Sequence, residues 1–153
     1  MRKMPAKPNY FQRNWVRLLC FTLFCLYLYI VAKVCFMNSS EIMEKAGKFA
    51  ELLKKLGEHD KIVHFCLFFP YPVLAFFCMR PYNTTFFNEL IFFVVVMLLG
   101  ASLAFNTECA QGIYFPSRSF DIKDFFADAL GMGISGLLLL AGIIYYRLNN
   151  KIK

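Results

Sequence analysis

Four stretches of the chain are each apolar over the length that a helix needs to cross a bilayer. The hydrocarbon core requires about 20 mostly apolar residues in one helix. Such stretches run over residues 18–37, 62–79, 86–111 and 124–146. The first is longer than the apolar core of a cleaved signal peptide, and no clean small-x-small cleavage site follows it. The sequence therefore predicts an all-α integral membrane bundle of four transmembrane helices.

The composition excludes a soluble domain. Of the 153 residues, 59% are hydrophobic and 19 are Phe. The mean hydropathy of +0.51 is well above what a soluble domain of this size carries. Membrane lipids are therefore the expected surroundings of most of the chain.

Two local patterns refine this prediction. Pro70 and Pro72 fall inside the second apolar stretch and predict a kink, which membrane helices tolerate when neighbouring helices satisfy the freed backbone groups. Between the first and second stretches, residues 41–57 repeat apolar side chains at helical spacing among lysines. They predict an amphipathic helix, which either lies on the membrane surface or packs across the open end of the bundle.

The distribution of basic residues predicts the orientation. With four spans, both termini lie on one side, together with the loop between the second and third spans. That side carries nine basic residues and one acid, Glu89, whereas the other side carries eight basic residues and nine acids. The positive-inside rule assigns the basic side to the cytoplasm, so residues 1–17 form a basic cytoplasmic tail. The net charge of +7 thus serves topology, and no nucleic-acid partner is expected.

Polar residues gather where three of the predicted helices reach the opposite, outer side. Moving an ionisable side chain to the membrane centre costs about 2.5–3.5 kcal/mol, so such groups normally face a partner or a wet cavity. The polar residues of this chain lie at the start of the second span, at the end of the third span, in the loop after it and at the start of the fourth span. These candidate pocket residues are Asp60, Lys61, His64, Glu108, Gln111, Arg118, Asp121, Asp124 and Asp128. The carboxylates of Glu108 and Asp128 lie deepest, and their expected partners are Arg118, Lys61 and His64.

Small residues continue these polar positions along two helix faces. Gly100 and Ala104 precede Glu108 on one face of the third span, and Gly131 and Ser135 follow Asp128 on one face of the fourth. Small residues let membrane helices approach closely, so the two faces are expected to pack together. The GxGxxG pattern over residues 131–136 lies within a span, where it indicates packing rather than dinucleotide binding.

Three blocks of these residues, in this order, resemble the VanZ-like family of small bacterial membrane proteins. The blocks are Asp60-Lys61-x-x-His64-Phe65, Glu108-x-x-Gln111 and Arg118-x-x-Asp121-x-x-Asp124-x-x-x-Asp128-x-x-Gly131. The resemblance spans residues 60–136, about half of the chain. One position departs from the family pattern. Four residues after the Asp that corresponds to Asp124, the family usually has Asn, whereas this chain has Asp128.

The resemblance implies that residues 18–153 form a VanZ-like domain in a bacterial cytoplasmic membrane. The family is named after a protein associated with low-level resistance to the glycopeptide antibiotic teicoplanin. A role in the cell envelope and in antibiotic resistance is therefore implied, but no settled reaction comes with the family name.

Three functions remain open. In the favoured one, an accessory or binding protein holds an anionic lipid-linked or cell-wall-related group through Arg118, Lys61 and His64, because Arg suits bidentate recognition of phosphate or carboxylate. In the second, an intramembrane enzyme acts on a lipid-linked phosphate, with His64 as acid or base and Glu108 or Asp124 orienting it or holding a metal. In the third, the polar residues are structural, with Asp121 or Asp124 capping the fourth helix.

The residues themselves assign no catalytic group. One His among scattered acids is a weak metal signature, so no metal site and no cofactor are predicted. The oligomeric state is left open.

Overall fold

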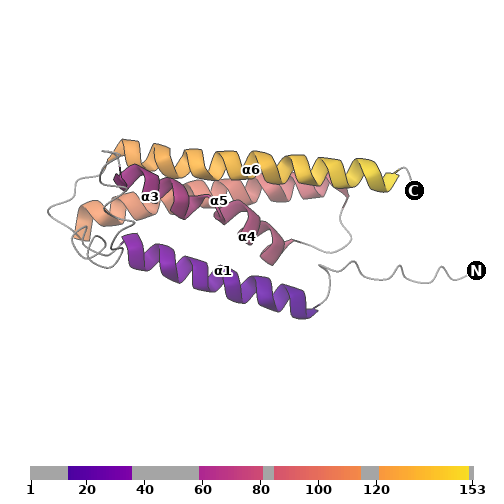
Figure 1. Cartoon of the computed structure of the whole chain (residues 1–153), viewed down its shortest axis with the longest axis horizontal. Coiled ribbons are helices and arrows are strands. Elements are labelled where there is room, and N and C mark those ends of the chain that lie inside the picture. Colours follow the sequence, from indigo (N-terminus) through magenta and orange to yellow (C-terminus); the bar gives the residue numbers. More distant parts are fainter. Residues whose placement is uncertain (1–13, 36–58, 81–84, 115–120, 152–153) are drawn as a thin grey trace, which may run out of the picture.

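The computed structural model describes residues 14–35, 59–80, 85–114 and 121–151, nearly all of which are helical. The helices, labelled as in Figure 1, are α1 (Asn14–Cys35), α3 (His59–Phe68), α4 (Tyr71–Met79), α5 (Phe86–Tyr114) and α6 (Ile122–Lys151). No strand occurs in these described ranges. The predicted amphipathic helix over residues 41–57 lies outside them, and so does the predicted basic tail except for residues 14–17, which begin α1.

Four helical segments are long and apolar enough to cross a membrane. They are Trp15–Cys35, Lys61–Met79, Phe86–Tyr114 and Ile122–Asn149. Large apolar side chains on them, including Leu98, Leu137 and Leu138, are about two-thirds exposed in the isolated chain, as expected for surfaces that contact lipid. The predicted all-α bundle of four transmembrane helices is therefore confirmed, and the chain is a multi-pass membrane protein.

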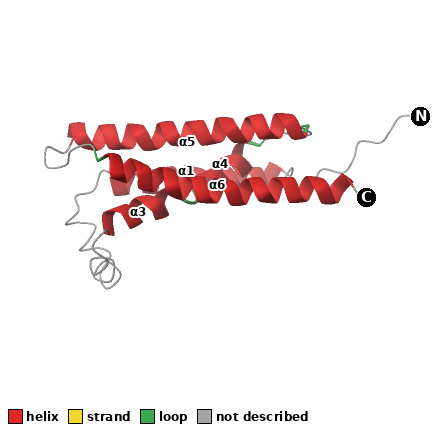
Figure 2. Cartoon of the chain, turned by 90° about the horizontal axis from the view of Figure 1, so that it is seen from above, coloured by secondary structure: helices red, strands yellow, loops and turns green. Residues whose placement is uncertain are grey.

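The helices run along one common axis, as Figure 1 and the perpendicular view in Figure 2 both show. The start of α1 and the end of α6 lie at one end of the bundle (Figure 1). At the other end, the last turns of α1 and α5 lie near the first turns of α3 and α6. This second end carries those candidate pocket residues that the structure describes, and we call it the polar end.

The predicted kink is present in the second span as a break between α3 and α4. α3 ends at Phe68 and α4 begins at Tyr71, with Pro70 between them and Pro72 in the first turn of α4. The Tyr27 hydroxyl of α1 donates a hydrogen bond to the Leu67 carbonyl next to the break, at 2.9 Å. A side chain from a neighbouring helix thus satisfies backbone that the prolines disturb, which is how a broken helix persists in a membrane.

Small residues decide how closely the helices approach. A Cβ at Gly131 of α6 would collide with the backbone carbonyl of Phe65, so α6 lies directly against the backbone of α3 at this point. A Cβ at Gly100 of α5 would collide with the Tyr71 ring and with the sulfur of Met132. The stripes of small residues are therefore packing surfaces of α5 and α6, but they do not pack on each other throughout as expected, because Gly131 lies against α3 and Gly100 lies against Tyr71 of α4 as well as Met132 of α6.

The glycines of α6 give a matched test of this packing. We expect Gly131→Ala to destabilise the bundle by about 1–3 kcal/mol, because the backbone of Phe65 has to move to admit a Cβ. Gly133 lies two residues further on, and nothing lies within 4 Å of a Cβ there. Gly133→Ala should therefore leave stability unchanged or raise it slightly. Unfolding in mixed micelles followed by circular dichroism measures both variants, and equal losses would contradict this account of the helix contact.

Candidate functional site

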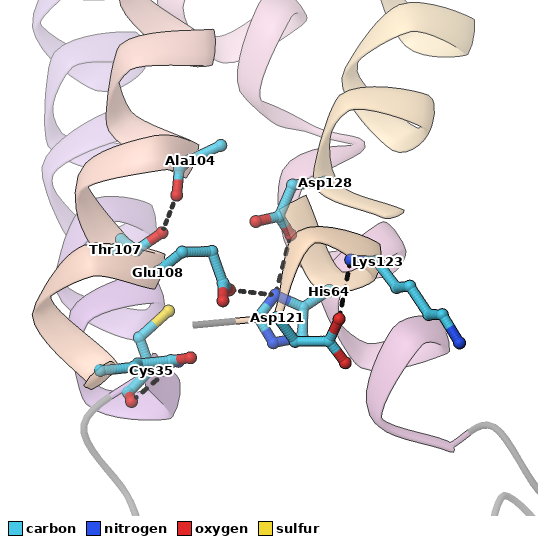
Figure 3. Close-up of polar contacts among 9 residues, drawn as sticks. Cys35, His64, Ala104, Thr107, Glu108, Asp121, Lys123 and Asp128 are labelled. Carbon is cyan, nitrogen blue, oxygen red and sulfur yellow. Dashed lines mark hydrogen bonds and ion pairs between the residues drawn. The ribbon is translucent and has the colours of Figure 1, made fainter. Parts of the chain in front are cut away.

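Three buried ionisable side chains from three different helices meet at the polar end (Figure 3). They are His64 of α3, Glu108 of α5 and Asp128 of α6, with 5%, 1% and 0% of their surface exposed. The His64 Nδ1 atom lies 3.0 Å from Asp128 Oδ1 and 3.6 Å from Glu108 Oε1. We call these three residues the polar cluster.

The close contact between α3 and α6 positions two members of this cluster. Phe65, whose carbonyl lies against Gly131, directly follows His64. Asp128 precedes Gly131 by three residues and so lies on the same face of α6, one turn nearer the polar end. The glycine thus lets the two helices approach until the His64 ring and the Asp128 carboxylate are within hydrogen-bonding distance.

The hydrogen bonds of the cluster leave some carboxylate oxygens unused. An ionised carboxylate only accepts hydrogen bonds, so Nδ1 of His64 donates its proton to Asp128 Oδ1. The backbone of Asp121 hydrogen-bonds the Glu108 carboxylate. Within the described part of the chain, Asp128 Oδ2 and Glu108 Oε1 are buried without a hydrogen-bond partner. One imidazole thus faces two carboxylates whose capacity to accept is only partly filled.

Two further aspartates, Asp121 and Asp124, lie at the start of α6 and differ in their roles. Asp124 is 8% exposed and close enough to interact electrostatically with His64, Glu108 and Asp128, so it adds negative charge beside the cluster. Asp121 precedes α6, and its Oδ1 accepts a hydrogen bond of 2.9 Å from the backbone N–H of Lys123. Asp121 is therefore the N-cap of the helix, one of the structural roles considered for it from the sequence.

Gln111 is held by a structural contact. Its side-chain amide donates a hydrogen bond of 3.1 Å to the backbone carbonyl of Cys35, the last residue of α1. The end of a helix leaves carbonyl groups without intrahelical donors, and Gln111 satisfies one of them while joining α5 to α1. We therefore assign Gln111 to the support of the bundle.

Of the two basic residues, Lys61 and Arg118, that were expected at this site with His64, the structure describes only Lys61. Lys61 is half-buried in the first turns of α3, and no ion pair joins it to the polar cluster among the residues described. Asp60 belongs to α3, but its side chain lies outside the description, as does Arg118 altogether. The suggested pairing of Arg118 with Glu108 remains a prediction, whereas the suggested pairing of His64 with both deep carboxylates is present.

A second buried carboxylate cluster lies at the opposite end, and the sequence reading did not identify it as a cluster. Glu89 of α5 is 1% exposed and forms ion pairs with Arg80, next to α4, and with Arg147 of α6. Arg147 contributes both Nε and Nη2, each at 2.8 Å from Glu89 Oε2. The signal in the sequence was the single acid among nine bases on that side. Here two guanidinium groups balance one carboxylate, the reverse of the charge ratio at the polar cluster.

The geometry of the polar cluster is compatible with a metal ion. One ligand atom from each of His64, Glu108 and Asp128 can be chosen so that all three lie within 4.8 Å of one another. No metal site was predicted from the sequence, because one His among scattered acids is a weak metal signature, and a metal on Glu108 or Asp124 was considered only for the enzyme alternative. No family model, no curated protein and no solved structure matches this chain.

The His64–Asp128 contact can be tested by comparing two substitutions. We expect Asp128→Ala to destabilise the protein by about 1–3 kcal/mol, because it leaves Nδ1 of a buried imidazole without its acceptor. Asp128→Asn keeps an oxygen in the same place and should cost less than about 1 kcal/mol. Unfolding in mixed micelles measures both free energies. Similar losses for the two variants would show that the hydrogen bond does not contribute.

Proposed function

We propose that this protein is a VanZ-like protein of a bacterial cytoplasmic membrane, with both termini in the cytoplasm. Its polar end faces outward and binds an anionic lipid-linked or cell-wall-related group, as an accessory protein of the cell envelope linked to teicoplanin-type resistance. One observation supports this most strongly. Three motif blocks that are far apart in sequence contribute His64, Glu108 and Asp128 to one buried cluster with unfilled hydrogen-bonding capacity.

The ratio of charges distinguishes the polar cluster from the ion cluster around Glu89. A structural ion cluster in a membrane is expected to saturate its charges, as Glu89 does with two arginines at the opposite end. The polar cluster holds two carboxylates against one imidazole, with Asp124 adjoining them. Among the described residues, negative charge and acceptor capacity therefore exceed the partners available, which supports recruitment of a cation or a hydrogen-bond donor from outside the chain.

The proposal predicts a phenotype in a teicoplanin-challenged bacterial host that expresses the chain. We expect Arg118→Ala and His64→Gln each to lower the minimum inhibitory concentration to that of the empty vector, because the first removes the bidentate donor and the second removes the imidazole of the buried cluster. Gly133→Ala is the control, since its Cβ meets no neighbour. Immunoblotting of membranes checks expression. Wild-type susceptibility in both site variants, at normal expression, would contradict the role in resistance.

The orientation can be measured separately. We expect a green fluorescent protein fused to the C-terminus to fluoresce, because that protein matures in the cytoplasm, and alkaline phosphatase at the same position to be inactive. Moving alkaline phosphatase into the loop between α5 and α6 should give an active enzyme, because the positive-inside rule places that loop outside. The opposite pattern of activities would place the polar end in the cytoplasm.

A second candidate function is an intramembrane enzyme that acts on a lipid-linked phosphate. The favouring observation is the buried pairing of His64 with Asp128, because a carboxylate on one ring nitrogen orients an imidazole and strengthens it as a base. Release of inorganic phosphate from lipid phosphates by the purified protein in micelles would favour this function. Turnover that survives His64→Gln would exclude His64 as the acid or base.

A further inference from the structure

We propose that His64, Glu108 and Asp128 bind one divalent transition-metal cation, such as Mn²⁺ or Zn²⁺, and that this cation presents open coordination positions to an oxygen of the envelope ligand. The cation site is inferred from the geometry of the polar cluster. Its contact with the ligand rests on the proposed function.

The distances within the cluster suit ligands of one ion. Two ligands that each lie about 2.1 Å from a cation are roughly 3.0 Å apart at a right angle and roughly 3.4 Å apart at the tetrahedral angle. The His64 Nδ1 atom is 3.0 Å from Asp128 Oδ1 and 3.6 Å from Glu108 Oε1. All three ligand atoms lie within 4.8 Å of one another, and side-chain rotations that bring the two carboxylates closer would place them around one centre.

Charge balance also favours a divalent cation. Two ionised carboxylates and a neutral imidazole carry two negative charges, and one divalent cation makes the buried group neutral. Without a cation, and counting only the described residues, an imidazolium balances one of the two carboxylates, and Asp124 adds to the excess. Burial of uncompensated charge costs several kcal/mol, so neutralisation is a strong driving force.

The hydrogen-bonding pattern leaves ligand atoms available. Asp128 Oδ2 and Glu108 Oε1 are buried, and within the described chain they accept no hydrogen bond. A histidine ligates through the neutral ring, so binding moves the proton from Nδ1 to Nε2 or to solvent. The cation then takes the place of the proton that Nδ1 donates to Asp128. One nitrogen and two carboxylate oxygens match the preferences of Mn²⁺ and Zn²⁺ better than those of the purely oxygen-seeking Mg²⁺ and Ca²⁺.

Three protein ligands do not complete a coordination sphere. A tetrahedral ion keeps one position open and an octahedral ion keeps three, and either geometry accepts a phosphate or carboxylate oxygen. This explains how a site rich in carboxylates can attract an anion that those carboxylates alone would repel. The cation reverses the sign of the local charge.

The test is direct binding of Mn²⁺ to the full chain, purified in micelles without a polyhistidine tag. We expect about one Mn²⁺ per chain by electron paramagnetic resonance, displaced by Zn²⁺, and a melting temperature that rises with Mn²⁺ concentration. Electron spin echo spectroscopy should show a directly coordinated nitrogen, which His64→Gln removes. Absence of both Mn²⁺ and Zn²⁺ binding by the wild-type protein would overturn the proposal before any variant is made.

Isosteric variants show where the ion binds. We expect Asp128→Asn and Glu108→Gln each to weaken Mn²⁺ binding at least ten-fold. Even substitution of residues that only hydrogen-bond a metal ligand lowers metal affinity by that factor. Glu89→Gln is the matched control, a buried carboxylate on α5 at the opposite end whose loss should leave Mn²⁺ affinity unchanged. Binding that is undiminished in both site variants, or equally weakened in the control, would overturn the assignment.

The outcomes also separate this inference from the proposed function. Stoichiometric Mn²⁺ binding together with unchanged teicoplanin susceptibility in His64→Gln would support the cation site and contradict the role in resistance. Loss of resistance in His64→Gln with no metal binding by the wild type would contradict the cation site and leave the envelope function standing.

Discussion

The structure depends on how ionisable groups inside a membrane bundle find partners. Hydrocarbon offers no hydrogen bonds, so each buried carboxylate has to be matched by a group from another helix. At one end Glu89 of α5 is matched by Arg80 and Arg147, which joins α5 to the end of α4 and to α6. At the other end the partner is His64 of α3. The buried charges thereby set which helices adjoin at both ends.

The two ends of the bundle provide different amounts of positive charge for their buried carboxylates. Glu89 forms ion pairs with two guanidinium groups that are themselves about 30% exposed, so positive charge exceeds negative charge among these three residues. His64 is shared by two carboxylates that are almost completely buried. Among the described residues, positive charge is therefore in excess at the Glu89 end and negative charge at the polar cluster, which supports the cation site proposed for the polar end.

Much of the fold could be predicted because its signals are long and local. Apolar stretches of the length of a bilayer predicted the four spans, and Pro70 predicted the break between α3 and α4. Helical spacing predicted that Glu108 lies on the same face of α5 as Gly100, and that Asp128 lies on the same face of α6 as Gly131. Both faces are buried in the structure. Such periodicity tells which way a side chain faces on its own helix, and that was sufficient to gather the candidate site.

Partner choice could not be predicted, because it depends on rotation and depth of one helix against another. The sequence offered Lys61, His64 and Arg118 as partners for the deep carboxylates, and only contact between α3 and α6 at Gly131 places His64 beside Asp128. The same limit applies to Gln111, which has the spacing of a site residue but binds the end of α1. Glu89 was counted for topology, and its two arginines become neighbours only when α4, α5 and α6 pack.

Asp128 contributes both a hydrogen bond and a negative charge to the polar cluster. An Asn at this position, as in the pattern of the VanZ-like family, would accept the same hydrogen bond from His64 while removing one negative charge. The fold is therefore nearly indifferent to this exchange, because packing at Gly131 and the bond to Nδ1 both survive it. The site is not indifferent, because two carboxylates attract a divalent cation far more strongly than one carboxylate beside an amide. A position that costs the fold so little to vary can tune the charge of the cluster independently of its geometry.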